Sequence, residues 1–394
     1  MPKAIFLFSL FFLYIACSRH ENEVLPEHIK KLGKLTVYPA DTEPELDIRL
    51  VREQSFGSTD EVLIGSIGDM AVDESGRVFI SDKIRQTTNV FADDGRYLTQ
   101  LGRKGKGPAE FRNIFSLKVI ENQLYVTDNI QQQCTIFSLD TLAYSHTVRL
   151  HPENQDSYEE LTGLNPAQYF IKSNGTFLVR FQPMLVPLPD HPRYNLNDIT
   201  IRYYTMSPGG IISDNVLEQD GTQYLTATIN GEFEWSYNFL FTDKPLIAIS
   251  DDNRLFSARR EEFLIKIHGP DGEYLYAFYY PYQRMRLTRG DALSSSTDNA
   301  YRKNVIRHAD LPETWPALNE MLIDDKNRLW VSTIVENFEV YEWWVLKATG
   351  ELLARFTWPR EKNIEEIKNG NLYARETDEE TGLQQIVRYR IEMN

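Results

Sequence analysis

Cysteine is scarce in this chain, since its 394 residues include only Cys17 and Cys134. A fold held together by a disulfide framework is therefore excluded. Cys134 lies in the stretch QQQCTIF, which predicts a strand, and we expect it to be a small buried residue rather than a nucleophile. Stability then has to come from side-chain packing.

Residues suited to metal or covalent catalysis are also few. The seven histidines show no tight spacing of the kind that marks a metal site. The sequence has no GxSxG motif and gives no local support for a serine or cysteine nucleophile with its base. It predicts no metal site and no cofactor, and it assigns no catalytic residue.

Positive charge is in deficit as well. The chain has 57 Asp and Glu against 42 Lys and Arg, which gives a formal net charge of −15. A protein with this negative charge repels the phosphate backbone of a nucleic acid, and no run of basic residues is long enough to overcome the repulsion. A nucleic-acid partner is therefore not expected.

The one long hydrophobic run lies in the first seventeen residues. Lys3 precedes an apolar segment, Ala4 to Ile15, that is too short to span a bilayer as a stable helix. This pattern is typical of a secretory signal peptide over residues 1–17. Its end, YIAC, resembles a bacterial lipobox with Tyr14 where that pattern prefers Leu, which implies lipidation of Cys17. An ordinary leader with an incidental cysteine is the alternative.

Residues 18–45 are polar, interrupted by proline and without a sustained period, so we expect a tether. A serine directly after the lipidated cysteine resembles the default sorting signal of outer-membrane lipoproteins. The resemblance implies a cell-envelope protein that is attached to the outer membrane through its N-terminal lipid and is either periplasmic or surface-exposed.

Residues 46–394 contain a repeat of short strands. An apolar triplet preceded by a turn recurs six times, as Val78–Ile80, Leu124–Val126, Phe177–Val179, Leu255–Ser257, Leu329–Val331 and Leu372–Ala374. Triplets that are apolar on both faces fit strands that neighbouring sheets cover on either side. The sequence therefore predicts an all-β fold, a six-bladed β-propeller of four-stranded antiparallel blades.

The last repeat contains only three credible strands, Ile364–Ile367, Leu372–Arg375 and Ile386–Ile391. A missing fourth strand would leave an open sheet edge. We expect the N-terminal strand Leu46–Val51 to complete this blade and close the ring, with Leu35–Tyr38 as the alternative donor.

The segment LGRKGKGPAEF, residues 101–111, follows the first complete repeat and resembles the inter-blade linker of NHL-type six-bladed propellers. Ala109 stands where that family favours Gly. Over residues 46–394 the chain looks like the bacterial six-bladed propeller lipoproteins with NHL-like repeats, although the third repeat diverges. Some propellers with related blades resemble metal-dependent lactonases or amidating lyases, whose ligands gather on the axis. The resemblance thus implies an alternative function, a metal-dependent hydrolase or lyase with an axial active site.

Charged residues end several of the aligned strands, namely Asp82, Asp128, Arg180, Arg259 and Arg375. Equivalent positions of a propeller meet around its axis, so these residues predict a polar mouth suited to an anionic ligand. The alternative is that they pair with one another and join adjacent blades. The glycines and cations of residues 103–107 predict either a phosphate cradle or a plain linker.

Two insertions carry aromatic residues, and the second predicts a short helix over Asn299–His308. Trp235 and Tyr237, with Tyr282 and Trp315, form either a stacking platform for a sugar or peptide or a satellite core under long loops. Because loops on a rigid scaffold usually carry binding, we expect a monomeric envelope module that binds a glycan, a peptide or a partner protein rather than an enzyme.

Overall fold

The computed structural model of the chain describes residues 25–183, 199–236, 238–296 and 299–394. The chain divides into two compact units, Met1–Leu32 and Gly33–Asn394. The described part of the first unit holds the short helix α1 (Glu27–Lys30), and every strand within the described residues belongs to the second unit. No helix in the described ranges is long and apolar enough to cross a membrane. Cys17 and Tyr237 lie outside the described residues.

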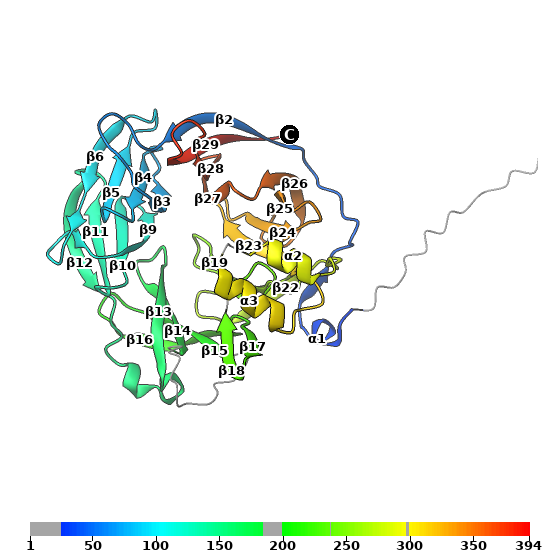
Figure 1. Cartoon of the computed structure of the whole chain (residues 1–394). Helices are drawn as coiled ribbons and strands as arrows, with labels where there is room; N and C mark the ends of the chain where they lie inside the picture. The colour runs from blue at the N-terminus through cyan, green and yellow to red at the C-terminus, as the bar shows by residue number, and fades with distance from the viewer. Residues whose placement is uncertain (1–24, 184–198, 237, 297–298) are drawn as a thin grey trace, which may run out of the picture. The chain divides into compact units, whose positions relative to one another are not determined.

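The second unit is a six-bladed β-propeller of four-stranded antiparallel sheets, as predicted (Figure 1). Blade one consists of β3 (Ile67–Val72), β4 (Val78–Asp82), β5 (Thr87–Phe91) and β6 (Tyr97–Leu101). Blade two consists of β9 (Ile114–Ile120), β10 (Gln123–Asp128), β11 (Gln133–Ser138) and β12 (Ala143–Arg149). Blade three consists of β13 (Leu164–Ile171), β14 (Phe177–Pro183), β15 (Thr200–Met206) and β16 (Ile212–Asp220).

The other three blades follow in chain order. Blade four consists of β19 (Pro245–Ile249), β20 (Leu255–Arg259), β21 (Leu264–His268) and β22 (Tyr274–Tyr279). Blade five consists of β23 (Leu318–Ile323), β24 (Leu329–Ile334), β25 (Val340–Leu346) and β26 (Leu352–Pro359). Blade six consists of β27 (Asn363–Lys368), β28 (Asn371–Thr377), β29 (Gln384–Met393) and β2 (Ile48–Phe56).

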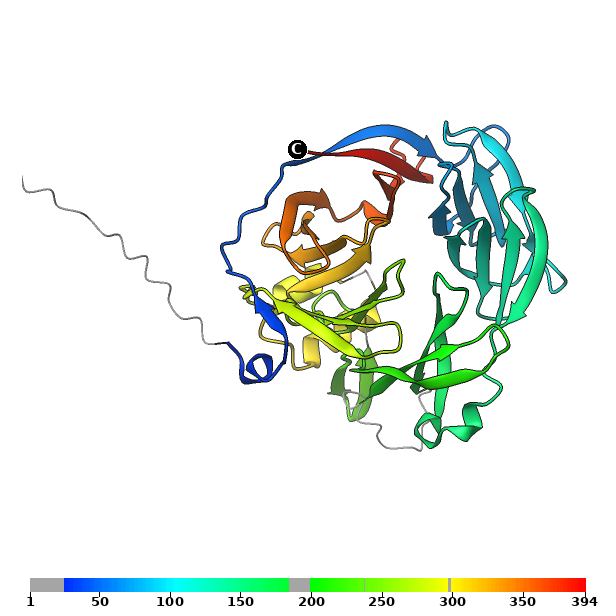
Figure 2. The same cartoon turned by 180° about the vertical axis from the view of Figure 1, so that it is seen from behind.

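The inner strand of each blade borders the centre of the ring, and the recurring triplets lie in the second strands (Figures 1 and 2). The triplets are buried because neighbouring blades pack on both of their faces. Phe79 and Val90 of blade one, for example, share a core cluster with Leu124 and Val126 of blade two. Each fully buried large apolar side chain of this kind contributes about 1.5–3 kcal/mol, so stacking between blades holds the ring together.

The N-terminal strand closes the ring, which confirms the prediction. Strand β2 pairs antiparallel with β29, with Ile48 opposite Met393 and Phe56 opposite Ile386 (Figure 2). The strand is longer than predicted and begins two residues later. The alternative donor has another place, because β1 (Leu35–Val37) adds a fifth, parallel strand to β22 of blade four. The end of the expected tether is therefore bound to the propeller.

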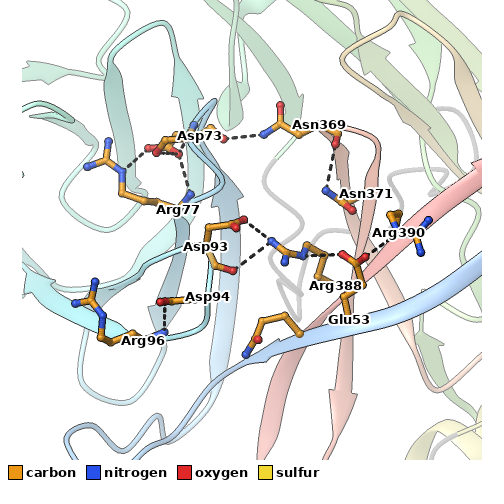
Figure 3. Close-up of polar contacts among 12 residues, drawn as sticks. Glu53, Asp73, Arg77, Asp93, Asp94, Arg96, Asn369, Asn371, Arg388 and Arg390 are labelled. Carbon is orange, nitrogen blue, oxygen red and sulfur yellow. Dashed lines mark hydrogen bonds and ion pairs between the residues drawn. The ribbon is translucent and has the colours of Figure 1, made fainter.

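Polar contacts reinforce the junction between blades six and one (Figure 3). Arg388 in β29 binds Asp93 of blade one, and its Nε lies 3.6 Å from Oε2 of Glu53 in β2. Arg390 binds the same carboxylate of Glu53 at 2.7 Å. Asn369 donates from its side-chain amide to the carbonyl of Asp73 at 2.9 Å. The two chain ends are thus joined to each other and to the first blade.

Connections between the blades hold the remaining elements. The linker strands β7 (Arg103–Lys104) and β8 (Glu110–Phe111) pair in parallel, and η1 (Gln155–Ser157) and η2 (Glu159–Leu161) precede blade three. A hairpin, β17 (Leu225–Ile229) with β18 (Glu232–Ser236), lies between blades three and four. Helices α2 (Arg289–Ser294) and α3 (Ala300–His308) lie between blades four and five, so the helix predicted at 299–308 is confirmed.

Cys134 is fully buried in β11, also as predicted, and burial raises the pKa of its thiol.

Candidate functional site

All inner strands begin on one face of the propeller, and both insertions emerge there. We call it the insertion face. The second strand of each blade ends on the same face, because neighbouring strands run antiparallel. The predicted charged residues accordingly lie at or near this face, and the structure shows what each of them contacts.

Asp82 and Asp128 have the same role in blades one and two. The carboxylate of Asp82 accepts backbone N–H groups of Gly65, Ile84 and Arg85 at 2.8–3.1 Å. Burial opposes its ionisation, but these donors and the Arg85 guanidinium outweigh burial and lower the pKa of Asp82. Asp128 accepts four backbone N–H groups in the equivalent loop and turn of blade two. Both carboxylates are fully buried and are used to hold loops of their own chain.

The three arginines are placed differently. Arg259 binds Asp243 and the carbonyls of Asp220 and Gly221, which joins blades three and four. Arg375 binds Glu365 at 2.9 Å and donates to the carbonyls of Ile67 and Gly68, which joins blades six and one.

Arg180 is less engaged. Its guanidinium donates to the side chain of Gln182 at 2.8 Å, and its Nε has no hydrogen-bond partner among the described residues. Within the described ranges no ion pair joins two of the five predicted residues. The arginines at 259 and 375 thus join blades through other partners, whereas the Nε of Arg180 contacts no acceptor in the part of the chain that the structure describes.

The inner strands bring together ionisable residues that the sequence analysis did not single out. We call this set the axial charge ring. It consists of Asp69 in β3, Lys118 in β9, Arg180 in β14, Lys244 before β19, Glu320 in β23, Glu365 and Glu366 in β27, and Arg375 in β28. Every blade contributes at least one member. Only Arg180 and Arg375 had been predicted.

Electrostatic interactions link the members around the ring. Asp69 interacts with Arg375 and Lys118, and Glu365 interacts with both Arg375 and Asp69. Glu320 interacts with Glu365 on one side and with Lys244 on the other, and Lys244 in turn interacts with Arg180. The carboxylates come from blades one, five and six, whereas the cations come from blades two, three and four, apart from Arg375. The ring therefore has an acidic half and a basic half.

Burial shifts the pKa of several members of the ring. It raises the pKa of Glu320 to about 7, helped by Glu365, and it also raises the pKa of Glu366 to about 7. Burial likewise raises the pKa of Asp69 and lowers the pKa of Lys244. The charged forms of these four groups are thus disfavoured by burial, and a charge of opposite sign on a ligand would stabilise them.

Bulges in the inner strands explain why the sequence did not reveal these residues. The pairing register of the inner strand shifts near Asp69, Glu320 and Glu365, and also in β9 and β13. A bulge places an extra residue on one strand and redirects side chains, so strict alternation no longer tells which residue faces the axis. The available signal was the presence of charged residues inside otherwise apolar strands.

Two cavities lie on opposite faces of the propeller. On the insertion face, a cavity of about 580 Å³ is lined by Asp243, Arg259, Glu261, Arg284 and the segment 312–316. Arg284 binds Glu261 at 3.0 Å across this cavity wall. On the opposite face, a cavity of about 530 Å³ is lined by β9, β13 and β19 and includes Lys118 and Lys368. The insertion-face cavity is lined by Arg259, which was a predicted site residue, and by residues 312–316 of an insertion that was expected to carry binding.

The predicted aromatic residues divide. Trp315 is 1% exposed and packs edge-on against Phe241 in a cluster with the helices α2 and α3, so it belongs to a satellite core. Tyr282 is partly buried and donates to the carbonyl of Ile334. Trp235 in β18 packs against Tyr224, and its backbone carbonyl accepts the hydroxyl of Tyr301. Tyr237 is not described, so a platform made with Trp235 stays a prediction.

The glycine-rich linker is occupied by its own chain. Glu110 accepts the backbone N–H groups of Lys106 and Gly107 at 2.9 Å each and binds Arg103 at 2.7 Å. These donors lower the pKa of Glu110. The carboxylate therefore fills the position that an external phosphate would take.

Comparisons with known proteins agree with the fold. Residues 55–170 match the family model DUF5128, described as a 6-bladed beta-propeller. No curated protein matches the chain. A solved structure of a protein from Bacteroides fragilis described as exported is 11% identical, with a TM-score of 0.50 over 91% of this chain and 99% of that one. A DUF4221 protein from Bacteroides vulgatus is 10% identical, with a TM-score of 0.49 over 89% of this chain and 99% of that one.

No group of three or more His, Cys, Asp or Glu side chains within the described residues is arranged to hold a metal ion. The ring carboxylates thus do not form a metal centre of that kind. The chain is a six-bladed β-propeller whose residues 55–170 are similar to the DUF5128 family, with an axis lined by opposed charges.

Proposed function

We propose that this chain is an exported, lipid-anchored binding module of the cell envelope that holds a peptide at its axial charge ring. The leader and the YIAC sequence support export and lipidation of Cys17, and the glycine-rich linker supports NHL-like repeats. The serine after Cys17 supports attachment to the outer membrane. The ligand class rests on the ring itself.

The observation that carries this proposal is the separation of charge across the axis. Asp69, Glu320 and Glu365 stand on one side, together with the cation Arg375, and Lys118, Arg180 and Lys244 stand on the other. Of the ligands expected for an envelope module, a peptide is the one that regularly carries both an ammonium or guanidinium group and a carboxylate. A peptide with both charges matches the two halves of the ring, which gives it orientation as well as affinity.

Two members of the basic half are suited to bind a carboxylate. The Nε of Arg180 has no partner within residues 25–183 and the other described ranges, and the planar guanidinium offers a fork that fits a carboxylate. Burial lowers the pKa of Lys244, so a ligand carboxylate would stabilise its ammonium form. Glu320 on the acidic half is suited to bind a cation, because burial raises its pKa and a ligand cation would stabilise its carboxylate.

A retention experiment tests the proposal. The purified chain is immobilised, exposed to peptides from proteolysed envelope protein, and the retained peptides are identified by mass spectrometry. We expect the wild type to retain a subset rich in peptides with both charges, and the double variant Arg180→Met/Lys244→Met to lose it. The matched control Arg96→Met/Arg149→Met removes two exposed cations away from the axis and should retain the same subset. Equal retention by both double variants would rule the ring out as the binding site.

A further inference from the structure

Four large apolar side chains are strongly exposed on the insertion face of blades one and two. Leu63 is 52% exposed, Ile84 63%, Phe115 42% and Ile130 56%. Leu63 lies in the loop before β3, Ile84 and Ile130 lie in the turns after β4 and β10, and Phe115 lies near the start of β9. Exposed residues of this size carry a cost in solubility, and several together mark an interaction site.

Hydrogen bonds and close contacts connect the loops that carry the four side chains, which places these loops next to one another. The Arg85 guanidinium donates to the carbonyl of Leu63, and Gly65 lies directly against the side chain of Ile84. Gln86 accepts the N–H of Ile114 at 2.7 Å, which joins the Ile84 turn to the beginning of β9.

The same pattern continues into blade two. Asn113 donates to the side chain of Asn129 at 2.5 Å, which joins the start of β9 to the turn that carries Ile130. Leu63, Ile84, Phe115 and Ile130 therefore follow one another across two blades. We call them the apolar strip.

Cations surround the apolar strip, although the chain as a whole is acidic. The exposed cations of its loops and of the adjacent linker are Lys83, Arg85, Arg103, Lys104, Lys106 and Arg112. The same segments contain only three exposed or partly exposed carboxylates, those of Asp60, Glu61 and Glu110. Glu110 is already bound by Arg103 and two backbone amides. Exposed cations thus outnumber exposed carboxylates around the strip, on a protein whose formal net charge is −15.

The shape of the surface favours a membrane over a protein partner. Ile84 and Ile130 stand in tight turns that project from the blades, and none of the cavities described above is lined by a residue of the strip. Projecting aliphatic and aromatic side chains among lysines and arginines suit the boundary between headgroups and acyl chains. A protein partner of comparable affinity would need a larger complementary surface with a packed core.

We propose that the apolar strip and its cations bind an anionic membrane surface. The apolar side chains enter the headgroup region, and the lysines and arginines contact the negative headgroups. This contact is independent of the lipid proposed at Cys17 and of the axial ligand.

Vesicle binding by the unlipidated protein tests this inference. The chain starting at Ser18 lacks the leader and Cys17 but keeps every strand of the compact unit Gly33–Asn394. It is sedimented with vesicles of phosphatidylcholine alone and with vesicles of equal parts phosphatidylcholine and phosphatidylglycerol. We expect binding to the mixed vesicles only, and we expect molar salt to release the protein because salt screens exposed charges.

Variants locate the contact. Ile84→Ser/Ile130→Ser should reduce partitioning to the mixed vesicles by about tenfold or more, since each change removes an inserted aliphatic side chain. Ile211→Ser/Tyr144→Ser is the matched control, because both residues are similarly exposed but lie elsewhere, and it should bind like the wild type. Thermal unfolding of each variant shows that it is folded.

Two results would overturn the inference. One is a wild-type protein that does not bind the mixed vesicles or that binds both kinds of vesicle equally. The other is a strip variant that binds vesicles as the wild type does but no longer retains an acidic protein from envelope extracts, which would assign the strip to a protein partner.

Discussion

The guanidinium of Arg388 donates to the side chain and the backbone carbonyl of Asp93, although the two residues lie in the last and the first blade (Figure 3). The same guanidinium lies beside Glu53 in β2 and over the ring of Phe56, 5.9 Å from its centroid. One side chain therefore contacts the N-terminal strand, the C-terminal strand and the neighbouring blade. Polar contacts thus reinforce the propeller at blade six, where strands from the two ends of the chain meet.

Replacing Arg388 should weaken this junction. We expect Arg388→Met to lower the free energy of unfolding by about 1–2 kcal/mol, because it leaves Glu53 and Asp93 without their shared partner while keeping an apolar contact with Phe56. The side chain of Asp93 is 61% exposed, and solvent limits the loss on that side. Urea unfolding followed by tryptophan fluorescence measures the difference.

Arg96→Met is the matched control for that experiment. Arg96 follows the same turn as Asp93, but its side chain is exposed. We expect a change within about 0.5 kcal/mol. Equal destabilisation by both variants would show that Arg388 has no special role in closing the ring.

Asp128 should matter for stability rather than for a ligand. Asp128→Ala removes the acceptor of four backbone N–H groups in blade two and is expected to cost about 2–3 kcal/mol. Asp94→Ala, which removes an exposed carboxylate that accepts one N–H, should cost far less. The melting temperatures of the two variants provide the comparison. A folded Asp128→Ala protein of wild-type stability would return this residue to the list of candidate ligand contacts.

Much of the fold could be predicted because its signals are local. The turn before each triplet and the apolar triplet itself lie within a few residues of each other, so the sequence displays them directly. The donor strand could be predicted by elimination, since the last repeat lacked one strand. The pairing of β1 with β22 could not, because three residues of a parallel pair that forms across more than two hundred positions leave no local pattern.

The candidate site was harder to predict for a physical reason. Asp82 and Asp128 end their strands as expected. Their carboxylates accept hydrogen bonds from surrounding backbone amides, and no sequence pattern predicts those contacts. Glu320 and Glu365 face the ring because the inner strands bulge, which shifts the alternation by one residue. Position along a strand was predictable, whereas orientation at a bulge was not.

Cys134 should be unreactive in the folded protein. It is fully buried in β11, and burial raises the pKa of its thiol, so the nucleophilic thiolate is disfavoured and reagents have no access. In the chain starting at Ser18, Cys134 is the sole cysteine, and we expect a thiol-specific chromogenic reagent to label it only after unfolding in urea. Rapid labelling under native conditions would show that blade two opens readily.

Glu366 should make the stability of the propeller depend on pH. Burial raises its pKa to about 7 from an ordinary value of 4.5, so between these values the folded protein keeps a proton that the unfolded chain has released. The contribution of Glu366 to stability is therefore most favourable at or below pH 4.5. It declines as the pH rises towards 7 and stays low above that.

The variant Glu366→Gln removes this dependence while keeping an oxygen that accepts the backbone N–H of Val72. At pH 8 we expect it to be more stable than the wild type by about 1–3 kcal/mol, and at pH 5 we expect the difference to vanish or reverse. Other ring carboxylates titrate in both proteins, so the measured quantity is the difference in unfolding free energy at each pH. The control Glu361→Gln changes an exposed carboxylate and should give a difference that does not vary with pH. A pH-independent difference for Glu366→Gln would mean that the carboxylate is ionised in the folded ring, where Lys118 and Lys368 would then outweigh its burial.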